Sequence, residues 1–175
     1  MKLDRPSLGR YAPLVLFLYA AVGSLLGCSA PATFEHMIPT SFETVNKHLQ
    51  TVRVTVTGGQ ESVPVGRPQI TDAAFAQALI ASIAKSRTFS NVIEDQSPTE
   101  DYRLTVTLFT LDKRVFGQAV TLEAGWTLRR GATDAIVWRE AIVSQSAEGN
   151  FQKATEAAAR NNIAEGLAKI SKLNL

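Results

Sequence analysis

The stretch EDYRLTVTLFTLD, residues 100–112, alternates between two kinds of side chain. Every second residue is apolar, and the residues between are Arg or Thr until Phe109 is reached. The apolar residues are Tyr102, Leu104, Val106 and Leu108. A period of two, with many β-branched residues, is typical of a strand that buries one face and exposes the other. The stretch therefore predicts a half-buried strand, and the neighbouring segments determine the sheet that it joins.

Three further stretches show the same alternation. GQAVTLEAGWTLRR (117–130) and AIVWREAIVSQSA (135–147) follow at short spacing, and TVRVTVTGG (51–59) precedes them. Loops of about four residues separate the last three strands, and such loops favour an antiparallel meander. A short extended piece is also expected around Val92 and Ile93.

Two amphipathic helices complete the pattern. One is DAAFAQALIASIAKSR, which follows the candidate caps Thr71 and Asp72. The other is the Ala-rich FQKATEAAARNNIAEGLAKISKL, which follows the candidate cap Asn150. The order β-α-β-β-β-α predicts an α+β fold, with two helices packed on one face of a mostly antiparallel four-stranded sheet.

The N-terminal residues differ from the rest of the chain. Three basic residues and one acidic residue precede YAPLVLFLYAAVGSLLG (11–27), which has no charge. A membrane span needs about 20 apolar residues, and this run is shorter and contains Pro13. A cleaved leader over 1–27 is therefore expected, the alternative being a transmembrane helix. Residues 28–40 are expected to form the N-terminus and a tether, and 41–175 a single periplasmic domain.

Cys28 is the only cysteine. The sequence Leu25-Leu26-Gly27-Cys28 resembles the lipobox of bacterial lipoproteins, which implies acylation of the thiol and cleavage just before it. Several acyl chains would anchor the protein stably in a bilayer. Ser29, in place of Asp, implies the periplasmic face of the outer membrane; the inner membrane is the alternative.

Charge and length limit the classes of function. Removing residues 1–27 leaves 15 basic and 15 acidic residues in a chain of 148, which is the length of one domain. A chain with no net charge gives no electrostatic basis for binding nucleic acid.

Residues that could perform chemistry are sparse. The two histidines, His36 and His48, are expected at the surface, and no Gly-x-Ser-x-Gly motif or phosphate-binding glycine loop is present. We therefore predict no catalytic residues, no metal site and no cofactor. A hydrolase that recruits one of the histidines is a remote alternative.

Two groups of residues are candidates for contacts with a partner or ligand. Trp126 and Trp138 are expected on neighbouring strands facing one layer, either as core residues or as the lining of a hydrophobic groove. Arg114 and Phe116 lie in LDKRVFG (111–117), at the tip between two strands. This tip suits a contact with lipid head groups or a protein, and it is equally consistent with an ordinary hairpin loop.

These parts together resemble small outer-membrane lipoproteins that assist envelope transport. The resemblance rests on the segment from DAAFAQALIASIAKSRTFSNV to DYRLTVTL and on the closing AAARNNIAEGLAKIS. It points to the lipopolysaccharide-assembly lipoproteins and the auxiliary lipoproteins of ABC transport systems. The resemblance implies a non-enzymatic component of an envelope complex, anchored to the bilayer through acylated Cys28. A carrier of a lipid or another hydrophobic ligand is the alternative.

Overall fold

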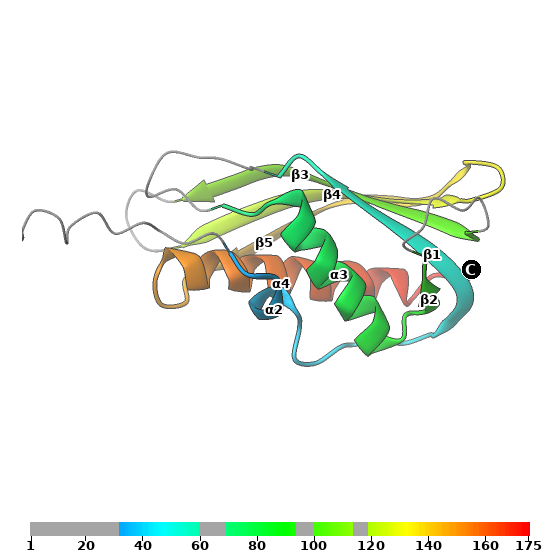
Figure 1. Ribbon diagram of the computed structural model, residues 1–175, viewed down its shortest axis with the longest axis horizontal. Coiled ribbons are helices and arrows are strands. Elements are labelled where there is room, and N and C mark those ends of the chain that lie inside the picture. The colour runs from blue at the N-terminus through cyan, green and yellow to red at the C-terminus, as the bar shows by residue number, and fades with distance from the viewer. Residues whose placement is uncertain (1–31, 60–68, 94–99, 114–118) are drawn as a thin grey trace, which may run out of the picture.

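The computed structural model describes residues 32–59, 69–93, 100–113 and 119–175, which form one sheet with helices on one of its faces (Figure 1). The strands are β1 (His48–Thr57), β2 (Phe89–Val92), β3 (Tyr102–Lys113), β4 (Val120–Arg130) and β5 (Ile136–Ser146). The helices are α2 (Phe34–Met37), α3 (Asp72–Ser86) and α4 (Phe151–Ile170). The predicted α+β class is confirmed.

The sheet differs from the prediction in strand number and direction. Its order is β2-β1-β3-β4-β5, and β1 runs parallel to both β2 and β3. Only β3, β4 and β5 form the expected antiparallel meander. The prediction of a mostly antiparallel four-stranded sheet was therefore wrong. The chain crosses over from β1 to β2 through α3, and such a crossover returns the next strand in the same direction. β3 then begins on the other side of β1, at the level where β2 ends, and continues in that direction.

The alternating pattern places the core on the helix side of the sheet. In β4 every second residue from Val120 to Leu128 is buried, and β3 repeats this pattern from Tyr102 to Leu108. The residues between them lie on the other face, which no described helix covers (Figure 1). The sheet therefore has one packed face and one open face.

Both long helices begin at the predicted caps. The Thr71 hydroxyl accepts a hydrogen bond from the Ala74 amide, and the Asn150 side chain accepts one from the Lys153 amide. Such caps satisfy backbone donors that have no partner inside the helix. The two helices are thereby fixed at their starting points over the sheet.

The first described residues are already packed. Met37 is fully buried, and the Ala32 amide donates to the Gln69 carbonyl at 3.2 Å. The buried Glu156 carboxylate on α4 accepts from the Thr33 amide at 3.1 Å and lies 3.1 Å from Nδ1 of His36. Residues 32–40 of the expected tether are thus held against the helix layer.

A helix that spans a membrane requires both sufficient length and apolar character. Within residues 32–59, 69–93, 100–113 and 119–175, no helix is both long enough and apolar enough to cross a bilayer.

Candidate ligand groove and partner surface

Trp126 lies in the core, beneath α4. It is fully buried, and its indole Nε1–H donates to Oδ1 of Asn162 at 2.9 Å. The Asn162 amide nitrogen donates in turn to the Ile142 carbonyl at 3.0 Å. Ser144 donates to the Ala158 carbonyl at 2.8 Å. These bonds join α4 to β4 and β5 through side chains whose polar atoms have partners.

Trp138 lies on the same face of the sheet as Trp126. It pairs with Leu128 on β4, and it is partly buried against the core. The expectation that both indoles face one layer is therefore confirmed, and Trp126 has the environment of a core residue. The other three candidate residues, Cys28, Arg114 and Phe116, lie outside the described residues.

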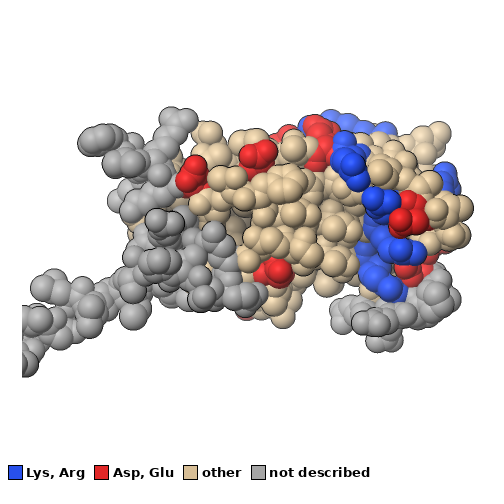
Figure 2. Space-filling view, turned by 90° about the horizontal axis from the view of Figure 1, so that it is seen from above, with Lys and Arg blue, Asp and Glu red and all other residues tan. Residues whose placement is uncertain are grey.

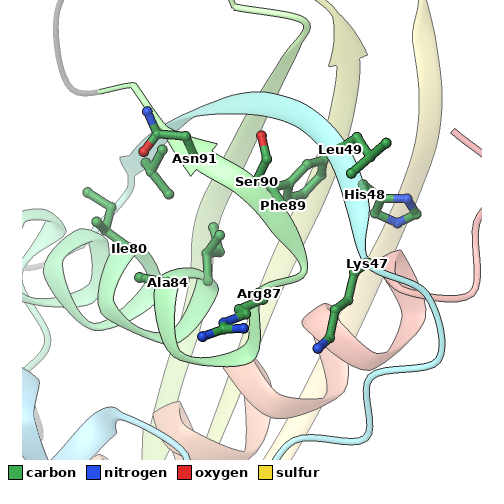
Figure 3. A pocket seen from close by; sticks show the side chains of 11 residues that line it. Lys47, His48, Leu49, Ile80, Ala84, Arg87, Phe89, Ser90 and Asn91 are labelled. Atoms are coloured by element: carbon green, nitrogen blue, oxygen red, sulfur yellow. The ribbon is translucent and has the colours of Figure 1, made fainter.

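A groove of about 440 Å³ lies between the end of α3 and the edge strand β2 (Figure 3). Its apolar lining includes Ile80 and Ile83 from α3, together with Phe89 and Val92 from β2. The rim carries Leu49, which is 88% exposed. A concave, mostly apolar site with a few polar groups is the usual form of a small-ligand site.

Two cationic side chains border this groove. Lys47 and Arg87 both line it, and their charged ends lie toward the same end of it in the view of Figure 3. No Asp or Glu is among the described residues that line it. Neither side chain forms a salt bridge or hydrogen bond with any residue in the described parts of the chain. As far as the structure describes it, the groove therefore combines an apolar floor with two cations that no carboxylate pairs.

Arg87 occupies a backbone conformation that usually belongs to glycine. It ends α3 with φ 56° and ψ 34°, and its amide donates to the Ile83 carbonyl at 2.8 Å. Glycine is the common residue at a left-handed helix terminus because a Cβ is disfavoured there. A long cationic side chain at this position is therefore a departure from local preference.

The ring of His48 bonds to the backbone and not to any nucleophile that the structure describes. His48 lines the groove but is only 6% exposed, so the expectation of a surface residue was wrong for it. Its Nε2 lies 3.1 Å from the Ile170 carbonyl, and the nearby Ser90 hydroxyl donates to the Gln50 carbonyl. No group of three possible metal ligands occurs among the described residues.

The open face of the sheet carries a row of arginines. Arg53, Arg103 and Arg129 are opposite one another across β1, β3 and β4. Figure 2 views this face and shows a band of basic side chains across one end, while much of the remainder is uncharged. Like charges directly opposite one another are destabilising unless they are compensated.

Two carboxylates separate these arginines. Glu100 lies 2.9 Å from Arg53 and 2.7 Å from Arg103, and Asp134 bridges Arg103 and Arg129. A hydrogen bond from its own backbone, followed by the bond from Arg103, lowers the pKa of Glu100, although its burial acts in the opposite direction. The row is consequently a fixed network of alternating charges.

Apolar side chains also reach the open face. Phe109 is 59% exposed, and its ring lies over Gly125, where an added Cβ would be 2.5 Å from Cζ. Val143 on β5 is 54% exposed. The open face therefore offers both charged and apolar contacts to another molecule.

Sequence reasoning did not identify the groove or the arginine row. Arg87 follows the last residue of α3, and its left-handed backbone becomes evident only in the structure. The arginine row depends on the strand register, which the sequence alone does not give.

Solved structures share this fold at low sequence identity. A protein of Xanthomonas campestris matches with a TM-score of 0.53 and 14% identity, over 71% of this chain and 83% of that one. A hypothetical protein of Chlamydia trachomatis matches with a TM-score of 0.55 and 8% identity, over 70% and 96%. PelC of Paraburkholderia phytofirmans, crystallised as a dodecamer, matches with a TM-score of 0.54 and 13% identity, over 77% and 95%.

The sequence itself matches one family model. Residues 68–171, more than half of the chain, match the model described as the ABC-type transport auxiliary lipoprotein component. No curated protein matches the chain. The matched segment contains α3, the groove-lining strand β2, the meander and α4.

Proposed function

Since the chain belongs to the family of ABC-type transport auxiliary lipoproteins, we propose that it is a non-enzymatic accessory component of an envelope complex that moves lipid or lipopolysaccharide. The family match over residues 68–171 carries this proposal. The surroundings of His48 and Ser90 support a role without catalysis, because neither side chain is directed at the other.

The proposed attachment is a lipid on Cys28. We propose that residues 1–27 are removed, that Cys28 is acylated, and that the domain lies at the periplasmic face of the outer membrane, with the inner membrane as the alternative. Metabolic labelling of the full chain with an alkyne fatty acid, followed by intact-mass analysis, tests this. Cys28→Ser should abolish both the label and membrane retention. An unmodified thiol with the leader still attached would refute the proposed attachment.

The proposed partner surface is the open face of the sheet. It is not covered by any described helix, and it offers the exposed Phe109 and Val143 several residues along the strands from the arginine row. Arg114 and Phe116, which follow β3 in the sequence, are proposed to take part in the contact with the partner. A protein partner of this kind would bind both apolar and charged groups, as interfaces commonly do.

Site-specific photocrosslinking in the native envelope tests the partner surface. A photoreactive residue at Val143 or Phe116 should yield an adduct with a component of an ABC-type transport system. The same residue at Lys153, which is exposed on α4, serves as the control. Equal adducts from Val143 and Lys153, or adducts only with unrelated proteins, would count against the proposal.

Carriage of a hydrophobic ligand is a second candidate function. One observation favours it, namely the groove of about 440 Å³ with its apolar floor. This volume lies in the range of small-ligand sites, about 300–1,000 Å³. Trp126, which was a candidate for lining such a groove, is enclosed in the core instead.

A further inference from the structure

We propose that the groove between α3 and β2 binds a single-chain anionic amphiphile, such as a lysophospholipid with an acidic head group, and that Arg87 and Lys47 bind the head group. This inference rests on the second candidate function and names its ligand class and its site. It does not depend on lipid at Cys28 or on a protein partner.

The apolar part of the groove fits an acyl chain. Ile83 is fully buried and Phe89 is 2% exposed, so the groove floor is built from core side chains and is held rigidly. The volume of about 440 Å³ lies toward the lower end of the usual range for ligand sites, which suits one chain better than two. Burial of each methylene contributes about 0.8 kcal/mol.

The charge of the groove selects the head group. Among the described residues, Lys47 and Arg87 are the only charged ones that line it, and neither forms a salt bridge with a described carboxylate. An ammonium and a guanidinium facing one volume repel each other unless an anion lies between them. Phosphate and carboxylate groups match the planar donor array of arginine, so an acidic head group would satisfy both cations.

The backbone at Arg87 supports a ligand role. Its left-handed conformation costs about 1 kcal/mol or more for a residue other than glycine, and no hydrogen bond or ion pair of the side chain with a described residue offsets that cost. Strained positions occur more often where function requires them. Glycine would relieve the strain, but it has no side chain to place a guanidinium beside the groove.

Photoaffinity labelling of the full chain in membrane vesicles tests the inference. The probe is a photoreactive, clickable lysophosphatidylglycerol, compared with a lysophosphatidylcholine probe that has the same acyl chain. The inference predicts that the anionic probe labels peptides containing residues 80–92, and that it labels them about tenfold more strongly than the zwitterionic probe. A tenfold difference converts to about 1.4 kcal/mol, close to the lower limit for one hydrogen bond to a charged group.

Matched variants identify the head-group site. Arg87→Gly should reduce labelling by the anionic probe about tenfold and labelling by the zwitterionic probe, whose phosphate carries the same charge beside a choline cation, by a smaller factor, and Lys47→Gln should act in the same direction. Lys85→Gln is the control, because Lys85 lies exposed on the same helix but does not line the groove. Since glycine suits the backbone at position 87, Arg87→Gly should fold, which a thermal melt checks.

Other outcomes would overturn the inference. Equal labelling by the two probes would refute head-group recognition while leaving carriage of a hydrophobic ligand in place. Full protection by millimolar inorganic phosphate would show a phosphate site without an acyl chain. Absence of label from residues 80–92 would refute both this inference and the second candidate function, with no bearing on the accessory role.

Discussion

The two halves of the domain differ in how closely their side chains pack. In the half made of α4, β4 and β5, four alanines of α4 are fully buried against the sheet, and a chain of buried hydrogen bonds joins Trp126 to Asn162. In the half made of α3, β1 and β2, the edge strand has four residues, and a groove remains whose two cations form no ion pair with a described residue.

This difference suggests that the half around α4 determines stability, whereas the half with the groove serves binding. A close-packed region loses free energy of unfolding whenever a side chain changes size, whereas a region with a permanent groove does not depend on filling it. We therefore expect substitutions around α4 to act on stability and substitutions around the groove to act on binding.

The largest effect is expected at Trp126. Trp126→Ala removes a buried indole and leaves Asn162 without one of its partners, so we expect a loss of about 3–5 kcal/mol in the free energy of unfolding. Urea denaturation measures it. Ile80→Ala, on the partly exposed wall of the groove, is the comparison and should cost clearly less. Equal losses would remove the distinction between the two halves.

Gly166 should resist the substitution that normally strengthens a helix. A Cβ at this position would lie 2.6 Å from Cη2 of Trp126. Alanine is the better helix former by about 1 kcal/mol, but overpacking costs about 1–3 kcal/mol. We expect Gly166→Ala to lower the thermal midpoint. Ala164→Gly, on the same helix, controls for propensity, and an increase in midpoint for Gly166→Ala would contradict the close contact.

Acid should weaken the charge network on the open face. Because the folded-state pKa of Glu100 lies below its ordinary value of 4.5, its contribution to stability is present above that pH and is lost as the pH falls through the folded-state value. The pKa of Asp101 is lowered likewise, first by the hydrogen bond from the Thr51 amide. Glu100→Gln should therefore be less stable than the wild type at pH 7.

Thermal melts between pH 7 and pH 3 provide the measurement. The difference between wild type and Glu100→Gln should shrink as the pH falls, because protonation removes the same charge that the substitution removes. Glu148→Gln, whose carboxylate forms an exposed pair with Arg160, is the control and should differ little at any pH. A constant difference for Glu100→Gln would contradict the lowered pKa.

The smallest stability effect is expected at Arg87. Glycine fits the left-handed backbone there, so Arg87→Gly should leave the free energy of unfolding unchanged or raise it by up to about 1 kcal/mol. Lys85→Gly, inside the same helix, should lower it by about 1 kcal/mol. A marked loss from Arg87→Gly would mean that the side chain supports the fold and would weaken the case for a ligand role.

Much of the fold could be predicted from local patterns. The alternation in 100–112 and the segments after it identified the meander, and the caps Thr71 and Asn150 identified where the helices begin. The edge strand β2 was expected only as a short extended piece, because four residues carry too little periodicity. The parallel direction of β1 follows from the path of the chain through α3, which alternation along a strand does not encode.

The candidate sites were harder to predict than the elements. Trp126 and Trp138 share a face as their spacing indicated, yet the accessibility of an indole depends on what α4 places above it. The groove is lined by residues from β1, α3 and β2, and its charge arises from Lys47 and Arg87, which are 40 positions apart. Such a juxtaposition is a property of the tertiary structure.

The packing of Ala32 limits how far the domain can lie from a lipid anchor at Cys28. With an acyl group on Cys28 as proposed, only Ser29, Ala30 and Pro31 separate the anchor from a residue bonded to the domain. Four residues extend over at most about 14 Å, roughly half the thickness of the hydrocarbon layer of a bilayer. The domain would be confined to the immediate neighbourhood of the lipid surface, with little freedom to diffuse away from it. A transport component that contacts this domain must therefore itself reach the surface of the same membrane.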